Sequence, residues 1–480
     1  TDACEDFVLA VEICEDLWTA MPPSVNHALA GATIIANLSA SNEVIAKDEY
    51  REMLVKSQSA KLYCGYIYSD AGYGESTTDL VFAGDNMIAE NGTILARSKR
   101  FNNECVYTEL DLERLVGERK KSNTYNIVGS EKYVCVKLDM NIGDTKITRY
   151  VDKQPFVPSD DKKREKRSEE ILSIQSLGLK KRLDHTHAKT AVVGVSGGLD
   201  STLALLVTVR AFDSLNIDRK NIIAVTMPCF GTTDRTYNNA VNFANSLGVT
   251  LKEVNIKAAV NKHFADIEHD PNVYDVTYEN SQARERTQIL MDVANKSGGL
   301  VIGTGDMSEL ALGWATYNGD HMSMYGVNAG VPKTLIRYLV DYEAKRTNND
   351  ILKKTLQDIL DTPVSPELLP PKDGKISQKT EHIVGPYELH DFFLYHLMRF
   401  GSKPSKILRL AEVAFDGIYD REVILEWLKV FYRRFFAQQF KRSCLPDGPK
   451  VGSVALSPRG DWRMPSDASY QIWAKELETL

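Results

Sequence analysis

The sequence has no long apolar run, no paired cysteine motif and no excess of positive charge. No apolar stretch approaches the roughly 18 residues that span a membrane, and the N-terminal residues have no signal-peptide pattern. The seven cysteines form no Cys-x-x-Cys pair, which argues against a zinc site or a disulfide framework and favours a reducing cytoplasm. The net charge of −7 argues against a general nucleic-acid binder. We therefore expect no membrane partner and no nucleic-acid partner.

The composition is that of an ordinary globular protein of two or three domains. The 480 residues are 43% hydrophobic and 26% charged. Residues 1–150 alternate short strand-like runs with turns around one helix-like stretch, whereas strands and helices alternate regularly from residue 191 onward. We therefore predict one domain over 1–150, a linker and connecting helix over 151–188, and a second domain over 189–480. In the first domain the strand-like runs are 7–13, 31–39, 61–70, 79–98 and 133–140, and the helix-like stretch is 43–61.

The second domain is predicted to be an α/β domain with a doubly wound parallel sheet. Its strand-like runs 191–195, 221–228, 250–256 and 300–305 alternate with helical patterns, as parallel sheets require. Ligands of such sheets bind beyond the carboxyl ends of the strands. Polar or glycine-rich segments occupy those ends at 196–201, 227–236 and 303–313. The pattern predicts a nucleotide site at this edge.

The segment SGGLDS, residues 196–201, has the chemistry of a phosphate-binding loop. Its glycines let backbone N–H groups approach an anion, and the start of the following helix favours negative charge. Ser196 and Ser201 add hydroxyl donors, and Asp200 can hold the magnesium that accompanies a polyphosphate. No lysine lies between Val192 and Val209, which excludes a Walker A loop. The loop is better suited to holding pyrophosphate as a leaving group.

These residues resemble a known family. SGGLDS is similar to the loop of the N-type ATP pyrophosphatases (adenine nucleotide α-hydrolase-like fold), and the segments 278–295, 303–320 and 325–339 resemble NAD synthetase. The segments 441–453 and 457–469 are similar to the tail of its glutamine-dependent, bacterial type. The resemblance covers essentially the whole chain. It implies ATP-dependent amidation of nicotinic acid adenine dinucleotide (deamido-NAD) to NAD through an adenylate, with release of AMP and pyrophosphate. It also implies a homo-oligomer and an ammonia tunnel.

The resemblance also implies roles for individual residues of the second domain. Asp200 and Glu309 would hold Mg²⁺, and Trp314 and Tyr317 would suit stacking on a pyridine ring. Buried core aromatics are the alternative interpretation of these two rings. The residues implied to bind ATP are Gly194, Val195, Ser196, Gly197, Gly198, Leu199, Asp200, Ser201, Thr304, Lys333 and Ser365. Those implied to bind deamido-NAD are Asn280, Arg284, Glu309, Trp314, Ala315, Thr316, Tyr317, Asp320 and Lys441.

In the first domain, CEDLW at residues 14–18 resembles the nucleophile corner of nitrilase-type amidases, which form an α/β sandwich. Segments 31–41 and 66–92 continue the likeness. It implies that the Cys14 thiolate attacks the amide carbon of glutamine and forms a thioester while ammonia leaves. By the same matching, Ser41 and Lys47 would bind the glutamine. Cys64, Cys105 and Cys135 lie on strand-like runs, and we expect them to be core residues.

This domain departs from the family pattern at one point. Nitrilase-type amidases use a glutamate base and a lysine that both precede the cysteine by tens of residues, whereas thirteen residues precede Cys14. We therefore interpret the first domain as a partial nitrilase-like domain; an inactive amidase domain is the alternative. The 480 residues by themselves are expected to synthesise NAD from ammonia but not to turn over glutamine.

Three other functions compete with this interpretation. One is another amidotransferase that uses the same ATP loop, such as an enzyme that makes GMP or asparagine. Another is a binding or regulatory protein without chemistry, although Ser196, Asp200, Ser201, Thr304 and Glu309 are all intact. The third is a nitrilase-type amidase acting alone, which leaves the second domain unexplained.

Overall fold

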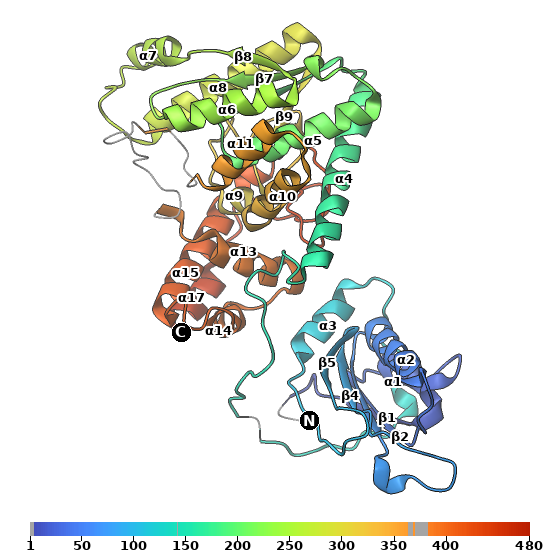
Figure 1. Ribbon diagram of the computed structural model, residues 1–480. Coiled ribbons are helices and arrows are strands. Elements are labelled where there is room, and N and C mark those ends of the chain that lie inside the picture. The colour runs from blue at the N-terminus through green and yellow to red at the C-terminus, as the bar shows by residue number, and fades with distance from the viewer. Residues whose placement is uncertain (1–3, 142, 363–367, 370–382) are drawn as a thin grey trace. The chain divides into compact units, whose positions relative to one another are not determined.

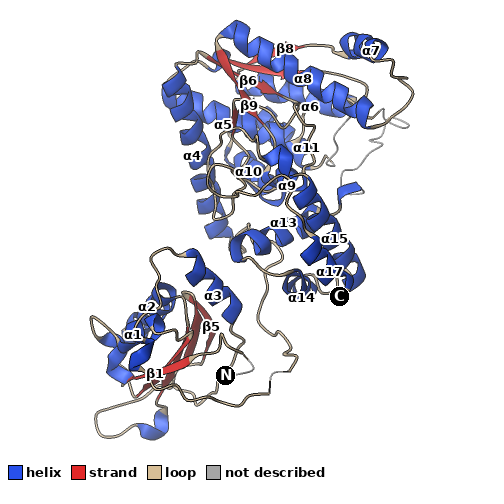
Figure 2. Cartoon of the chain, turned by 180° about the vertical axis from the view of Figure 1, so that it is seen from behind, coloured by secondary structure: helices blue, strands red, loops and turns tan. Residues whose placement is uncertain are grey.

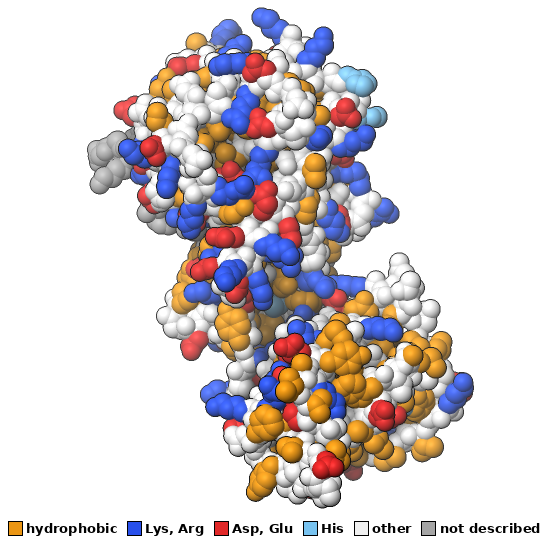
Figure 3. Space-filling view, turned by 45° about the vertical axis from the view of Figure 1, so that its right-hand side comes forward, with side chains coloured by type: hydrophobic (Ala, Val, Ile, Leu, Met, Phe, Trp, Pro, Cys, Tyr) orange, Lys and Arg blue, Asp and Glu red, His pale blue; other side chains and the backbone are white. Residues whose placement is uncertain are grey.

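The computed structural model describes residues 4–141, 143–362, 368–369 and 383–480. The chain divides into two compact units, Thr1–Val151 and Asp152–Leu480 (Figures 1 and 2). No helix among the described residues is long and apolar enough to cross a membrane. On the face drawn in Figure 3, lysine, arginine, aspartate and glutamate side chains are interspersed, and apolar side chains of the first unit are exposed.

The first unit contains a five-stranded mixed sheet in the order β1-β2-β3-β4-β5. Strands β1, β2 and β3 are parallel, and β4 and β5 continue antiparallel. The core includes Ile35 of β2, Tyr66 of β3 and Val55 of α2, so helix α2 covers one face of the sheet. The elements are β1 Leu9–Ile13, α1 Pro23–Leu29, β2 Ile34–Ser39, α2 Lys47–Leu62, β3 Gly65–Asp70, β4 Met87–Glu90, β5 Thr93–Arg97 and α3 Leu112–Lys121.

The strand predicted over residues 133–140 is wrong. These residues are paired with no described strand, and Val134 and Val136 are exposed. Cys105 and Cys135 are also exposed, so their predicted core positions are wrong, whereas Cys64 is buried as expected. Alternating apolar residues form a strand only where a neighbouring strand takes up their backbone hydrogen bonds.

The second unit is built on an all-parallel sheet in the order β10-β9-β6-β7-β8. This confirms the predicted α/β fold. The strand order reverses at β6, which pairs with β7 on one side and β9 on the other. The strands and their flanking helices are α4 Asp161–Thr186, β6 Thr190–Gly194, α5 Leu199–Leu215, β7 Ile222–Thr226, α6 Asp234–Leu247, β8 Thr250–Glu253, α7 Lys257–Asp266, α8 Val276–Ser297, β9 Gly299–Gly303, α9 Met307–Leu312 and β10 Tyr325–Gly326.

Buried residues lie on both faces of this sheet. Ala191 and Val193 of β6 pack in the larger core with residues of α4, α5 and α10. Val192 points the other way and packs with residues of α7 and α8, as the alternation of side chains along a strand requires. Helices therefore cover both faces. The remaining elements are α10 Lys333–Arg346, α11 Asp350–Leu360, α13 Tyr387–Tyr395, a π-helical turn His396–Phe400, α14 Pro404–Ala414, α15 Arg421–Ala437, α16 Gln439–Arg442 and α17 Gln471–Glu478.

Several helix boundaries follow from local chemistry. Thr233, Asp275 and Asp306 accept hydrogen bonds from backbone N–H groups in the first turns of α6, α8 and α9. Such side chains satisfy donors that have no partner within the helix. Gly248 and Gly298 end α6 and α8 in the left-handed conformation, which costs glycine little. Of these caps, Thr233 and Asp306 lie at strand-to-helix corners, after β7 and β9.

Candidate functional site

The loop 196–201 connects β6 to α5 at the carboxyl end of the sheet. Gly197 has a φ of +87°, and a Cβ atom there would collide with the carbonyl oxygen of Thr236, so the position requires glycine. The Ser201 hydroxyl lies 3.3 Å from the Ser196 hydroxyl and donates to the Gly198 carbonyl. The loop therefore keeps its backbone and hydroxyl groups at the start of α5, as an anion site requires.

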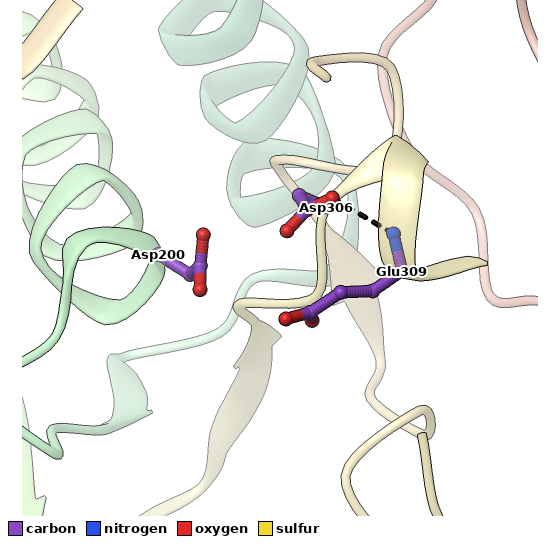
Figure 4. A group of neighbouring side chains, drawn as sticks. All are labelled: Asp200, Asp306 and Glu309. Atoms are coloured by element: carbon purple, nitrogen blue, oxygen red, sulfur yellow. Dashed lines mark hydrogen bonds between the residues drawn. The ribbon is translucent and has the colours of Figure 1, made fainter. Parts of the chain in front are cut away.

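Three carboxylates meet beside this loop (Figure 4). Asp200 comes from the first turn of α5, whereas Asp306 precedes α9 and Glu309 lies in its first turn. One oxygen from each can be chosen so that all lie within 4.8 Å of one another. The Lys333 ammonium, at the start of α10, lies 2.6 Å from Asp200 Oδ2, 2.6 Å from Asp306 Oδ2 and 2.9 Å from Glu309 Oε1. Strand ends far apart in the sequence thus build one charged cluster.

The electrostatics of the cluster follow from burial and like charge. Burial raises the pKa of Asp200 to about 6 even though Lys333 opposes the shift. Burial and the neighbouring Asp306 and Asp200 carboxylates also raise the pKa of Glu309. Burial disfavours the Lys333 ammonium, but the carboxylates outweigh it and raise the pKa of Lys333. One ammonium against three carboxylates leaves the site short of positive charge.

The donor set of this cluster fits a hard divalent cation. Magnesium prefers carboxylate oxygens, and Asp200, Asp306 and Glu309 offer only such atoms. Asp200 Oδ1 is buried and accepts no hydrogen bond from any described residue, and a buried charged oxygen without a partner is costly. The sequence pointed to Asp200 and Glu309, and the structure adds Asp306.

A cavity of about 280 Å³ opens from this cluster along the sheet edge. Ligand crevices of open α/β sheets occur at this place, where the strand order reverses. Arg286 and His321 also line it, and sequence analysis missed both. Of the predicted residues, the cavity is lined by Gly194, Val195, Ser196, Gly198, Leu199, Asp200, Ser201, Thr304, Glu309, Trp314, Ala315 and Asp320. The predicted Ser365 lies outside the described residues.

The predicted deamido-NAD residues form a second, adjoining group around the loop 313–320. Thr316 Oγ1 donates to Asn280 Oδ1 at 2.7 Å, and Arg284 Nε donates to the Tyr317 carbonyl at 3.3 Å. Lys441 Nζ donates to the Gly313 and Ala315 carbonyls at 2.8 and 2.6 Å. The structure thus brings α8, this loop and α16 together.

The two aromatic residues of the loop have different surroundings. The Tyr317 side chain is 45% exposed and its ring is nearly parallel to that of His321, with centroids 5.2 Å apart. The core interpretation is therefore wrong for Tyr317. Trp314 is half-buried, and the Arg434 guanidinium lies 5.2 Å from its ring centre, a cation–π distance. Tyr317 remains accessible for stacking.

In the first unit, Cys14 occupies a sharp corner directly after β1. It has a φ of +49° and begins the short 3₁₀ helix Cys14–Trp18, a conformation that is strained for a residue other than glycine. Ser39 Oγ lies 3.5 Å from Cys14 Sγ, and Asn37 Nδ2 donates to the Cys14 carbonyl at 3.2 Å. The corner holds the half-buried thiol at the carboxyl end of parallel strands β1 and β2.

The two predicted glutamine ligands lie on the segment that follows β2. Ser41 is buried, and its N–H donates to Asp70 Oδ1 at 2.9 Å. Lys47, at the start of α2, donates to the Asn42 carbonyl at 2.8 Å. Its ammonium also lies 5.5 Å from the centre of the Trp18 ring. Trp18 ends the helix that Cys14 begins, so Lys47 and the Cys14 corner contact the same short helix.

Asp306 is the residue of the cluster that sequence reasoning missed. Its side chain accepts hydrogen bonds from the Ser308 and Glu309 N–H groups at 2.7 and 3.0 Å, which is ordinary N-cap behaviour. An aspartate after a strand and before a helix, within GTGDMSE, was the available signal. The sequence pattern predicts a capping aspartate but does not show whether that aspartate also faces a charged site.

Comparison with known proteins identifies close relatives. A family model described as NAD synthase matches residues 171–418. The glutamine-dependent NAD(+) synthetase of Mycobacterium tuberculosis H37Rv is 43% identical over 98% of this chain and 74% of the relative, and that of Aquifex aeolicus is 28% identical over 95% and 74%. The crystal structure of a glutamine-dependent NAD(+) synthetase from Cytophaga hutchinsonii aligns with a TM-score of 0.55 at 20% identity, over 99% of this chain and 73% of that one. This last likeness concerns the fold alone.

Proposed function

This chain belongs to the glutamine-dependent NAD(+) synthetases, and on that basis we propose how its residues divide the reaction between two sites. The enzyme amidates deamido-NAD to NAD at the expense of ATP, takes the ammonia from glutamine, and releases AMP and pyrophosphate. The 43% identity across nearly the whole chain carries this conclusion. It excludes the three competing functions considered from the sequence.

We assign ATP activation to the loop 196–201 and the cavity beside it. The substrate carboxylate attacks the α-phosphorus, the bond to the pyrophosphate oxygen breaks, and an acyl adenylate forms. Backbone N–H groups of the loop and the start of α5 hold the departing pyrophosphate. Thr304, at the end of β9, lines the same cavity and hydrogen-bonds ATP. Ammonia then attacks the carbonyl carbon, and AMP leaves.

The charged cluster reduces the repulsion between the anionic reactants. Asp200, Asp306 and Glu309 would hold Mg²⁺, which supplies positive charge to the phosphates when bound. Lys333 keeps its proton because its pKa is raised. Its ammonium contacts all three carboxylates and holds them in place.

The loop 313–320 would orient deamido-NAD. Asn280, Arg284 and Lys441 anchor this loop through the contacts described above. The exposed ring of Tyr317 is available to stack on the pyridine. Because Trp314 and Asp320, near the two ends of the loop, both line the nucleotide cavity, a substrate held there has its carboxylate near the bound ATP.

We assign glutamine hydrolysis to the first unit. The Cys14 thiolate forms a bond to the amide carbon of glutamine, ammonia leaves with a proton, and water hydrolyses the thioester to glutamate. Ser41 and Lys47 would hold the glutamine. We also propose that the protein is cytoplasmic and homo-oligomeric, as its composition and its family predict; light scattering would measure the assembly.

The first experiment measures NAD formation from deamido-NAD, ATP and Mg²⁺, with ammonium or glutamine as the nitrogen donor. We expect NAD with ammonium. A Cys14→Ala variant is expected to keep that rate, because ammonium bypasses the thiol, and to lose any NAD formation that the parent shows with glutamine. A folded chain that binds ATP and forms no NAD with either donor would contradict the proposed function.

A further inference from the structure

The buried carboxylate of Asp391 links α9 and α10, two of the helices that carry residues of the charged cluster. Asp391 of α13 is 2% exposed. Its Oδ1 accepts a hydrogen bond from the Ser308 hydroxyl, and its Oδ2 accepts from the Thr334 N–H at 3.1 Å and the Thr334 hydroxyl at 2.6 Å. The Ser308 hydroxyl in turn accepts from the Lys333 N–H at 2.8 Å. We call Asp391, Ser308 and Thr334 the α13 bracket.

Both helix contacts of the bracket are adjacent in sequence to residues of the charged cluster. Ser308 directly precedes Glu309 and lies two residues after Asp306, and Thr334 directly follows Lys333. The bracket therefore fixes the first turn of α9 relative to the first turn of α10. Because α9 spans only Met307–Leu312, a single internal turn cannot define its orientation unaided.

From this geometry we propose that Asp391 is a positioning residue for the synthetase step. It holds Asp306 and Glu309 on α9 in register with Lys333 on α10, so that the three groups converge. The inference rests on the roles proposed above for the charged cluster. Asp391 itself does not line the nucleotide cavity. It acts through Ser308 and Thr334.

Its surroundings argue against a purely structural role. An ionisable group buried between helices usually stabilises a protein less than apolar residues of the same volume would. The neighbours of Asp391 on the same helix, Leu389, Phe392 and Phe393, are fully buried apolar side chains. The Tyr387 ring of α13 also lies 5.4 Å from the Lys333 ammonium. This helix therefore supports the cluster at two points.

The test is Asp391→Asn. The amide oxygen can keep both bonds from Thr334, but the NH₂ group then faces the Ser308 hydroxyl, which must turn its proton away and accept instead. The charge-assisted bond from Ser308 is therefore replaced by a weaker neutral one, with almost no change in volume. Loss of a group that orients ligands typically costs about 10- to 100-fold in metal affinity or activity. We expect that decrease in the ammonium-dependent kcat, with the KM for deamido-NAD unchanged.

A second readout does not depend on activity. Mn²⁺ alone, titrated against the protein and followed by electron paramagnetic resonance, is expected to bind about 10- to 100-fold more weakly to Asp391→Asn. Thr334→Val, which removes one hydroxyl link, is a milder variant. It is expected to shift kcat and Mn²⁺ affinity in the same direction by less.

Leu389→Ala is the matched control, because it weakens the packing of α13 without touching the bracket. It is expected to lower the melting temperature and leave kcat and Mn²⁺ affinity unchanged. If Asp391→Asn and Thr334→Val also lower the melting temperature but leave kcat and Mn²⁺ affinity unchanged, Asp391 has only a structural role and the inference is overturned. If the parent protein forms no NAD, the proposed function fails, and the Mn²⁺ titration alone then decides whether Asp391 positions the carboxylates.

Discussion

Lys333 is only 5% exposed, and its buried ammonium contacts three carboxylates. Removing one member of such a cluster leaves charges uncompensated in a low-dielectric site. The next residue, Thr334, donates instead to Asp391. The role of a side chain therefore depends on the atoms that it contacts in the folded protein, not on its neighbours in the sequence.

We expect Lys333→Met to lower the ammonium-dependent kcat by at least about 100-fold. The variant keeps most of the length of the side chain but removes the ammonium that holds the three carboxylates in place, and losing one preorganised donor of an active site costs about 10²- to 10³-fold. Steady-state assays at saturating ATP measure the effect. Lys353→Met, an exposed lysine on α11, should retain the parent rate. A Lys333→Met enzyme with near-normal kcat would show that the ammonium has no catalytic role.

At the scale of elements, α4 is fastened to α5 and α10 by ion pairs as well as by its apolar residues. Arg210 donates to both Glu169 oxygens at 2.9 and 3.1 Å, and Tyr342 donates at 3.0 Å. Arg346 also pairs with Glu169. Leu172, Leu179 and Leu183 of α4 belong to the core of the second unit. The predicted connecting helix is therefore an integral part of that unit.

The hydrogen bonds from Arg210 lower the pKa of Glu169 from 4.5 to about 2. A folded-state pKa below the unfolded one means that the stabilisation is complete above about pH 4.5 and disappears as the pH falls toward about 2. We expect Glu169→Gln to lower the melting temperature at pH 7 and to flatten its decline between pH 4.5 and 2. Scanning calorimetry across this range measures both. Glu165→Gln, an exposed site on the same helix, should reproduce the parent curve, and a parent-like curve for Glu169→Gln would contradict the argument.

At the scale of the whole molecule, each unit has a core of its own. Ile35, Val55 and Tyr66 belong to the core of the first unit, and Leu203 and Ile336 to that of the second. The first unit also contains a buried ion pair, in which Arg51 Nη1 lies 2.7 Å from Asp85 Oδ2 and both side chains are inaccessible to solvent. Separate cores predict separate unfolding transitions.

Arg51→Met is therefore expected to destabilise only the first unit. Breaking a buried pair from one side costs about 3–5 kcal/mol when the remaining charge has no other partner. Here the cost is expected to be smaller, because Arg97 still donates to both Asp85 oxygens, and it comes from the lost contacts of Arg51 with Asp85 and Glu43. Calorimetry should show one transition shifted to lower temperature and the other unmoved, with ammonium-dependent NAD formation retained. Lys61→Met, at an exposed position of α2, should shift neither transition. A joint shift of both would mean that the units unfold as one.

The sequence by itself determined the features that local chemistry controls. The glycines and hydroxyls of the loop 196–201, directly before a helical pattern, predict an anion site, and the strand–helix alternation after residue 191 predicts a parallel sheet. Long matching segments, rather than any single motif, identified the reaction.

Tertiary structure alone decided which of these features meet. Asp306 has the sequence pattern of an N-cap, and only the parallel order β9-β6 places it beside Asp200, about a hundred positions earlier. Asp391 is further removed, on α13, where a single aspartate among mostly apolar and aromatic residues gives no sign of its partners. The apolar run at 133–140 forms no strand because no described neighbour pairs with it. In each case the deciding interaction is long-range, and periodicity, capping and spacing carry no information about long-range contacts.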